Sequence, residues 1–325
     1  MRGRRILVTG AAGSVGWPLS LLLVPAAPGR LVLLDHHEYS LFTLERTLGG
    51  QPTYELADVR DRARLERVFN THQPEIVFHL AAAKHVPYGE RFPEGAVASN
   101  VLATRSLLQL AQATDVQVLL YPSSDKSVHP PSVYGATKRL GEALVQAAAQ
   151  STDQRFAIVR FVNIIGTRGS VIDNFTSWVR EDRPLRVTDE RMTRYWISMQ
   201  EALWCLLLAC QCAGAGEILM PDCGEPVPVI ETARRLAGWY RPDRDPYPVD
   251  CVGIRPGERL HEVLLSTNER FADGPAPGLR CVQTTRPAAA LEGLPAVMDT
   301  LATLTAAGER ERLTAECVAA AEALQ

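Results

Sequence analysis

The segment RRILVTGAAGSVG, residues 4–16, decides the fold that the sequence predicts for this 325-residue chain. Ile6-Leu7-Val8 is a short apolar run bounded by Thr9-Gly10, which predicts a buried strand. Glycines follow at positions 10, 13 and 16, and the apolar run 19–23 after them indicates a helix. Because glycines at a strand-to-helix turn permit a tight bend and close approach of the backbone to a pyrophosphate, the segment predicts a phosphate-binding loop.

The glycine spacing is GxxGxxG rather than GxGxxG, so an ordinary glycine turn is the alternative interpretation. The strand before the loop and the helix after it favour the phosphate-binding interpretation. Backbone amides at the start of such a helix point toward bound phosphates. We therefore expect a dinucleotide to contact Gly10, Gly13, Ser14, Val15 and Gly16.

An acidic residue ends the second predicted strand, at the position where a dinucleotide would place its adenosine ribose. Asp35 follows the run 30–34 and lies 19 residues after Gly16 (35 − 16). A carboxylate there accepts from the ribose 2′-hydroxyl and repels a 2′-phosphate, which favours NAD over NADP. His36 and His37 would weaken that preference when protonated, so NADP is the alternative cofactor, although both fit exposed loop positions.

Apolar runs and helical stretches alternate along the first half of the chain. Predicted strands cover 4–9, 30–34, 53–56, 75–80, 116–121 and 156–161, with predicted helices at 41–48, 62–71, 97–113 and from near 134. This alternation predicts an α/β protein with a doubly wound parallel sheet, the Rossmann arrangement, in the strand order 3-2-1-4-5-6.

The alternation weakens after Gly166, which indicates a smaller C-terminal substrate-binding domain. We expect the dinucleotide-binding domain to cover residues 1–166, with a helix at about 197–213 packed back on it. Residues 167–196 and 214–325 would then form the substrate-binding domain. The stretch from about residue 288 is rich in Ala, Leu and Glu and predicts helix.

Small and polar residues follow the third and fourth predicted strands, at the edge where open α/β sheets bind ligands. Asp58 would meet the adenine amino group or cap the next helix, and the two roles are about equally expected. Lys84 would face a diphosphate or lie free in a loop. The further residues expected at the cofactor are Val59, Ala81, Ala82, Ala83, Asn100, Tyr134 and Lys138.

The richest chemistry lies in residues 123–138, SSDKSVHPPSVYGATK, after the fifth predicted strand. Tyr134 and Lys138 are four apart and share a helix face. A nearby ammonium lowers the pKa of a phenol, which can then take a proton from an alcohol while hydride leaves. Tyr134 and Lys138 alone also fit an ordinary surface pair, but Ser124, Asp125 and Lys126 place a hydroxyl, a carboxylate and an amine nearby.

Composition excludes several classes of protein. The chain is 46% hydrophobic and 22% charged with a formal net charge of −3, which gives no basic excess for nucleic acid or an anionic membrane. The early apolar runs are too short for a signal peptide or a membrane span, so we expect a cytoplasmic protein. Seven cysteines without a CxxC pair predict neither a disulfide framework nor a metal site.

These segments together resemble the extended short-chain dehydrogenase/reductases that act on nucleotide sugars, in particular the polysaccharide-biosynthesis group with UDP-N-acetylglucosamine 4,6-dehydratases. The resemblance runs from about Arg4 to about Asn268. The glycine loop and YxxxK are specific to the superfamily only. The segments specific to the dehydratase-like group are Asp125-Lys126 before YGATK, MTRYW at 192–196 and GIRPGE at 253–258.

The resemblance implies a role for each matching residue. Tyr134 with Lys138 would deprotonate the sugar 4-hydroxyl as hydride passes to the nicotinamide, and Ser124 would bind the 4-oxygen. Lys126 would remove the C5 proton and Asp125 would protonate the departing C6 hydroxyl. The stored hydride would return to C6 and leave a 4-keto-6-deoxy sugar. Substrate contacts are expected from Lys84, Asn163, Arg194, Arg255 and Glu258.

Other reactions remain open on this fold. A nucleotide-sugar 4-epimerase or 4-ketoreductase would need Tyr134 and Ser124 without the Asp-Lys pair, and a non-catalytic dinucleotide-binding regulator is a third possibility. Val162 replaces the glycine usual before the strand-six Asn, which we expect to affect the sugar pocket. The resemblance also implies a homodimer or higher homo-oligomer, in which helices beside the active-site face pair between subunits.

Overall fold

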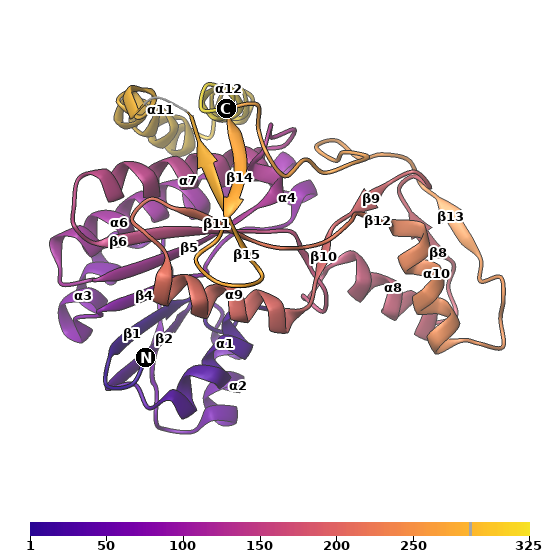
Figure 1. Ribbon diagram of the computed structural model, residues 1–325, viewed down its shortest axis with the longest axis horizontal. Coiled ribbons are helices and arrows are strands. Elements are labelled where there is room, and N and C mark those ends of the chain that lie inside the picture. Colours follow the sequence, from indigo (N-terminus) through magenta and orange to yellow (C-terminus); the bar gives the residue numbers. More distant parts are fainter. Residues whose placement is uncertain (286–287) are drawn as a thin grey trace.

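The computed structural model describes residues 1–285 and 288–325. In this part of the chain the main sheet has nine strands in the order β14-β15-β11-β6-β5-β4-β1-β2-β3 (Figure 1). β1 to β6 are parallel neighbours in the order 3-2-1-4-5-6, which confirms the predicted doubly wound sheet. The strands are β1 (Arg5–Thr9), β2 (Arg30–Asp35), β3 (Thr53–Leu56), β4 (Ile76–His79), β5 (Val118–Ser124), β6 (Arg155–Phe161), β11 (Ile218–Pro221), β14 (Glu269–Asp273) and β15 (Leu279–Thr284).

The sheet continues beyond the six strands that the sequence predicts. β11 pairs with β6 in parallel, and β15 and β14 then add antiparallel strands at that edge. Residues 218–221 and 269–284 thus belong to the sheet, whereas we expected them in the substrate-binding domain. Their runs are short, and residues 222–268, which include elements of the smaller lobe, separate β11 from β14. Periodicity therefore gives a weak signal, but these strands cover the edge that β6 would otherwise expose.

Helices flank both faces of the main sheet (Figure 1). The predicted helix at 97–113 is divided, because a π-helical turn, η2 (Ala98–Leu102), separates α5 from α6. The helices of the sheet domain are α1 (Gly16–Leu23), η1 (Val24–Ala26), α2 (Glu38–Leu48), α3 (Arg62–His72), α4 (Val86–Arg91), α5 (Pro93–Val97), α6 (Ala103–Ala113), η3 (Asp125–Ser127), α7 (Val133–Gln150) and α9 (Met199–Cys212). α9 packs on β5, β6 and β11, as we expected of the helix at about 197–213.

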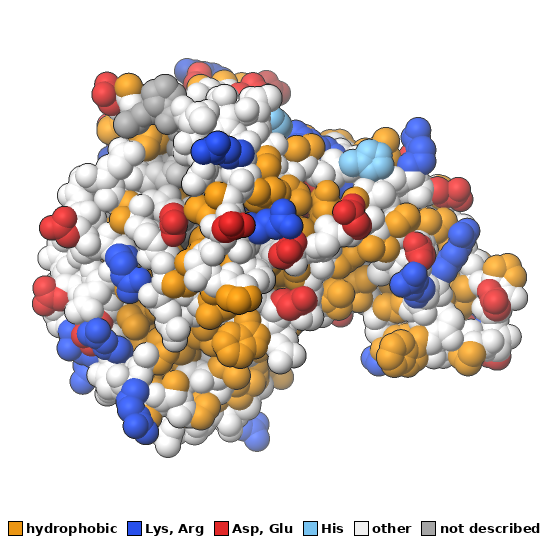
Figure 2. Space-filling model, in the orientation of Figure 1, with side chains coloured by type: hydrophobic (Ala, Val, Ile, Leu, Met, Phe, Trp, Pro, Cys, Tyr) orange, Lys and Arg blue, Asp and Glu red, His pale blue; other side chains and the backbone are white. Residues whose placement is uncertain are grey.

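A smaller lobe projects from one end of the sheet (Figure 1). Its own core packs Phe175 and Val179 of one helix against Val229 and Ala233 of another. On the face shown in Figure 2, acidic and basic side chains are interspersed. The elements of this lobe and its connections are β7 (Asn163–Ile164), α8 (Val171–Arg180), β8 (Leu185–Val187), β9 (Thr193–Arg194), β10 (Trp196–Ile197), β12 (Val227–Pro228), α10 (Val229–Tyr240) and β13 (Val249–Cys251).

The C-terminal stretch forms helices that pack on the sheet domain rather than on the smaller lobe. They are η4 (Ala288–Leu291), α11 (Leu294–Ala307) and α12 (Arg310–Glu322), and α12 contacts α7 and α5. α7 is almost wholly buried as a result. Among the described residues, no helix combines the length and apolar character needed to cross a bilayer.

Local sequence explains where the site-bearing elements begin. Pro130-Pro131 disfavours helix, and Ser132 then accepts from the backbone amide of Gly135 at 3.1 Å as the N-cap of α7. Ser198 and Glu201 form a capping box at the start of α9. α7 thus starts one residue before Tyr134, which places that side chain in the first helical turn beside the end of β5.

Candidate active site

The glycine loop has the close packing that its sequence predicts. Gly10 has φ +67°, and a Cβ there would lie 2.7 Å from the backbone nitrogen of Ala81 at the end of β4. A Cβ at Gly16 would overlap the Gly10 carbonyl and the Ala11 backbone, so Gly16 lets α1 pack against the loop. Backbone packing at Gly10 and Gly16 therefore leaves no room for a side chain at either end of the loop.

A cavity of about 660 Å³ opens beside this loop. A volume of this size at the carboxyl ends of parallel strands, beside backbone amides, fits a dinucleotide. The predicted cofactor residues that line it are Gly10, Gly13, Asp35, Asp58, Val59, Ala81, Ala82, Ala83 and Tyr134. Ser14 instead lines an adjoining cavity with Trp17, Tyr39 and Arg168.

Four residues that we expected at the cofactor lie behind this cavity's lining. Val15 is the N-cap of α1, and Gly16 begins that helix. Asn100 accepts from the Ala83 amide at 2.8 Å and donates to the Ala83 carbonyl at 2.9 Å, so it holds the lining loop. The Lys138 ammonium donates to the Pro122 carbonyl at 2.8 Å.

Asp35 is buried at the closed end of the cavity. Its carboxylate accepts from the amides of Ala12 at 3.0 Å and His37 at 2.9 Å. Asp58 binds the guanidinium of Arg60 nearby, and the hydrogen bond from Arg60 lowers the pKa of Asp58 despite partial burial. The helix-cap alternative for Asp58 is wrong, because the N-cap of α3 is Asp61, which accepts from the Arg64 amide at 2.9 Å.

Ser124, Asp125, Lys126 and Tyr134 meet where β5 passes through η3 toward α7. The Ser124 hydroxyl donates to Asp125 Oδ1 at 2.9 Å and is also hydrogen bonded to Tyr134. The Lys126 ammonium donates to the same Asp125 oxygen at 3.1 Å. The other oxygen, Asp125 Oδ2, is buried and has no hydrogen-bond partner among the described residues. Asp125 Oδ2 therefore has lone pairs that no described side chain uses.

The charges in this cluster differ from the expectation for Tyr134. We expected the Lys138 ammonium to lower the pKa of Tyr134, but burial raises it, and the Lys126 ammonium is the strongest opposing influence. Lys138 instead lies over the ring of Tyr121, 4.6 Å from its centroid, and burial lowers the pKa of Lys138 to about 8. Lys126, rather than Lys138, is thus the ammonium whose charge acts on the phenol of Tyr134.

Glu262 belongs to the cluster and was missed by the sequence interpretation. Its Oε1 lies 3.2 Å from the Lys126 ammonium and 3.4 Å from Arg194 Nε, and its side chain is 4% exposed. Glu262 belongs to the loop 252–268. Its position four residues after Glu258, the last residue of the GIRPGE segment, is the one sequence signal that could have indicated it as a site residue. Glu258, which we did select, accepts from the backbone amide of Arg255 at 3.3 Å.

A second cavity, of about 230 Å³, opens between η3 and the smaller lobe. Three predicted substrate residues line it with Lys126 and Glu262, namely Asn163, Arg194 and Glu258. Arg255 is exposed outside this lining, and Lys84 lines the first cavity, where its ammonium donates to the Arg168 carbonyl at 2.7 Å. Val162 lies in the main core, so the effect that we expected on the pocket lining is not seen.

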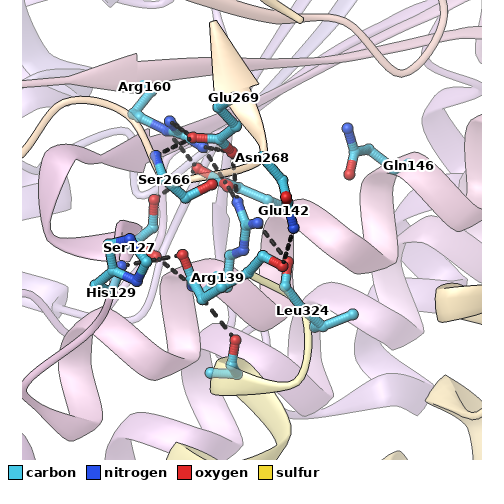
Figure 3. A network of polar contacts seen from close by, with 12 residues as sticks. Ser127, His129, Arg139, Glu142, Gln146, Arg160, Ser266, Asn268, Glu269 and Leu324 are labelled. Carbon is cyan, nitrogen blue, oxygen red and sulfur yellow. Dashed lines mark hydrogen bonds and ion pairs between the residues drawn. The ribbon is translucent and has the colours of Figure 1, made fainter. Parts of the chain in front are cut away.

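A buried network of four charged residues lies beside η3 (Figure 3). Arg160 donates to Glu142 and to Glu269 at 2.9 Å, and Arg139 donates to the same two carboxylates at 3.1 and 2.8 Å. The hydroxyl of Ser127, the last residue of η3, donates to Glu142 at 2.8 Å. The network thus joins η3 to α7, β6 and β14.

Comparison with known proteins places this arrangement in a family. The family described as polysaccharide biosynthesis protein matches residues 6–282. The probable polysaccharide biosynthesis protein EpsC of Bacillus subtilis is 35% identical over 84% of this chain, and this chain spans about half (47%) of EpsC. A UDP-N-acetylglucosamine 4,6-dehydratase (inverting) of Campylobacter jejuni is 30% identical over 82% of this chain and 79% of its own length.

Further similar proteins include an epimerase and two solved structures. A UDP-glucose 4-epimerase of Rickettsia rickettsii is 30% identical over 82% of this chain and 79% of its own length. The structure of Pen from Bacillus thuringiensis has 25% identity and a TM-score of 0.81, and covers 87% of this chain and 88% of Pen. DesIV, a dTDP-glucose 4,6-dehydratase from Streptomyces venezuelae solved as a double mutant with NAD, has 23% identity, a TM-score of 0.70 and coverage of 80% and 88%. By its sequence match and its fold, the chain belongs to the polysaccharide biosynthesis protein family of extended short-chain dehydrogenase/reductases.

Proposed function

We propose that the chain is a nucleotide-sugar 4,6-dehydratase that acts on a UDP-N-acetylglucosamine-like substrate with bound NAD. The single observation that carries the proposal is the pairing of Asp125 with Lys126, which lines the cavity beside the smaller lobe, close to Tyr134, which lines the larger cavity. Of the groups in this cluster, oxidation at C4 needs only the tyrosine as base, with bound NAD as the hydride acceptor, whereas elimination of water across C5 and C6 needs an acid and a second base as well. The cluster holds all three groups.

The residues present fit the cofactor. The loop at Gly10 excludes a side chain, and Asp35 lies where an adenosine ribose would reach it. Bound NAD would supply the hydride acceptor for C4 and the hydride donor for C6. NADP remains the alternative, since His36, His37 and Arg60 line the same end of the cavity.

Each group of the cluster has one task in this reaction. Tyr134 takes the proton of the 4-hydroxyl, and Ser124, hydrogen bonded to it, holds the 4-oxygen. The resulting 4-ketone makes the C5 proton acidic, so that Lys126 removes it. Burial raises the pKa of Asp125, which favours the protonated acid that the departing C6 hydroxyl needs. Arg194 and Glu258, in the second cavity, face the nucleotide end of the substrate.

The test is incubation of the purified protein with UDP-N-acetylglucosamine in deuterated water, followed by mass spectrometry and proton NMR. We expect loss of water from the sugar and deuterium at C5. Lys126→Ala is expected to lower turnover about 10²- to 10⁴-fold, since it removes the base, while oxidation at C4 and the absorbance of the reduced nicotinamide persist. Full dehydration by Lys126→Ala would contradict the role of this lysine.

A 4-epimerase is the second candidate, because the Rickettsia relative carries that name at similar identity. An epimerase needs Tyr134 and Ser124 without proton abstraction at C5. A C4 epimer that forms with no loss of water and no deuterium, and that Asp125→Asn leaves unchanged, would favour it.

The location and the partners of the protein are further proposals. We propose that it is a cytoplasmic homo-oligomer that binds neither nucleic acid nor membrane. The face of α7 is covered by α12 of the same chain, so pairing of subunits would have to use other surfaces than α7. Light scattering coupled to size-exclusion chromatography measures the assembly directly.

A further inference from the structure

Lys126 is surrounded by more acceptors than the proposed reaction uses. Its ammonium lies 3.1 Å from Asp125 Oδ1, 3.2 Å from Glu262 Oε1 and 3.4 Å from Asn163 Oδ1. An ammonium has three N–H donors, and three oxygen atoms are present to receive them. Lys126 is therefore held in one position as a cation.

Glu262 is itself held from the opposite side. Arg194 Nε lies 3.4 Å from Glu262 Oε1, and the guanidinium of Arg194 is fixed by donation to the carbonyls of Leu260 at 3.1 Å and Arg259 at 2.9 Å. Burial raises the pKa of Glu262, but the charges of Lys126 and Arg194 outweigh it and hold the pKa below its usual range. Glu262 thus stays ionised while its neighbours exchange protons.

We infer that Glu262 is a positioning residue that fixes the Lys126 amine and keeps one shared proton on the Asp125–Lys126 pair. The inference rests on the proposed dehydration. Before elimination, a Lys126 N–H bond breaks and the proton moves to Asp125, which gives an amine and a carboxylic acid side by side. Glu262 remains a carboxylate during this transfer, and its negative charge retains the shared proton on the Asp125–Lys126 pair.

The elimination then balances within the pair. The amine forms a bond to the C5 proton, and the electrons of the C5–H bond become the C5–C6 double bond. The C6–O bond breaks, and the hydroxyl leaves as water with the proton of Asp125. The pair ends as ammonium and carboxylate, as it began.

The charges around the pair support this assignment. Burial lowers the pKa of Lys126, and the carboxylates of Asp125 and Glu262 outweigh it and raise the pKa above its usual range. Burial is the largest influence that raises the pKa of Asp125. The charge of Glu262 raises this pKa further, whereas the charge of Lys126 lowers it. Tyr134 and Arg194 face the pair as well, and Arg259 faces Glu262. Removal of Glu262 alone therefore makes the shared proton easier to lose.

The test compares Glu262→Gln with Glu262→Asp across a pH series of kcat/KM for dehydration. We expect Glu262→Gln to move the descending limb of the profile to lower pH by about one to three units, the shift that one nearby charge produces. Glu262→Asp keeps the charge and is expected to keep the limb while turnover falls. If Glu262→Gln lowers activity equally at every pH, Glu262 has a merely structural role and the inference is wrong.

A second measurement does not need turnover. Acetic anhydride modifies an amine only in its neutral form, so modification of Lys126, measured by peptide mass spectrometry over pH, reports its protonation. We expect Lys126 to become reactive at lower pH in Glu262→Gln than in wild type, and an unchanged profile would overturn the inference. If the wild-type protein forms no dehydrated product, but Lys126 still becomes reactive at lower pH in Glu262→Gln, the proposed dehydration is contradicted and the effect of Glu262 on Lys126 stands.

Discussion

Replacement of Glu142 by Gln removes one of the two carboxylates from the buried network beside η3. Glu142 is 1% exposed and accepts from Arg160 at 2.9 and 3.0 Å and from Arg139 at 3.1 Å. The substitution leaves two buried guanidinium groups facing Glu269 alone. Removal of one partner from a buried ion pair costs about 3–5 kcal/mol, because the remaining charge has no compensation.

Differential scanning calorimetry measures this loss as a fall in the midpoint of unfolding. At about 2.1 cal/mol/K per residue, a chain of this length has an unfolding entropy of roughly 0.7 kcal/mol/K, so the midpoint should fall by about 4–7 °C. The control is Glu231→Gln, which breaks an exposed pair with Arg235 and should change the midpoint by about 1 °C or less. Adding Arg139→Met to Glu142→Gln restores the charge balance and should recover part of the loss.

The same network predicts the direction of the pH dependence. Burial raises the pKa values of Glu142 and Glu269, but the arginines outweigh it and hold both below the usual range. Carboxylates with lowered pKa values stabilise the fold above their unfolded pKa of about 4.3, and this stabilisation is lost as pH falls through the folded pKa. The midpoint of unfolding of the wild type should therefore fall in acid, and the midpoint of Glu142→Gln should fall by less. A Glu142→Gln midpoint within about 1 °C of wild type at neutral pH would refute the reasoning.

Two further substitutions test the cofactor cavity. Gly16→Ala places a Cβ against the Gly10 carbonyl and should lower both the unfolding midpoint and the affinity for NAD. The control is Gly50→Ala, where nothing lies within 4 Å of the added Cβ, and it should change neither. Calorimetry measures the midpoint, and titration with NAD measures the affinity. Asp35→Ser removes the carboxylate from the ribose end and should weaken NAD binding by about 10- to 100-fold, the effect of one hydrogen bond to a charged group, while NADP binding improves. Isothermal titration with both cofactors measures the change, and equal losses for the two would show that Asp35 only supports the Ala12 and His37 amides.

The parts of the fold that could be predicted are those with short-range signals. The strand before Gly10 and the alternation through β6 follow from local periodicity, and the predicted strand order is confirmed. β14 and β15 could not be predicted in the sheet, because only the edge of β6 and β11, distant in sequence, explains their position. The π-helical turn before α6 has no signal in the apolar pattern.

The site shows the same limit. Asp125, Lys126 and Tyr134 are within ten residues of one another, so one motif brings them together, and the structure places them in one cluster, in which Asp125 contacts Lys126 and Tyr134 is hydrogen bonded to Ser124. Glu262 reaches Lys126 over more than 100 residues of sequence, and spacing alone cannot favour it over Glu258. The pKa of Tyr134 was expected to fall, and it rises because burial, a tertiary property, outweighs the charges.

The buried network explains how a three-residue turn can keep Asp125 and Lys126 in place. η3 is too short to be rigid by itself, and in the proposed dehydration a shift of about 1 Å would separate the amine and the acid from their substrate atoms. Glu142 fixes its last residue through Ser127, and Gln325 accepts from the His129 amide at 3.1 Å just beyond it. On the other side, Glu262, which is itself paired with Arg194, holds Lys126. Because the network behind η3 pairs two guanidinium groups with two carboxylates, it holds the turn without a net buried charge.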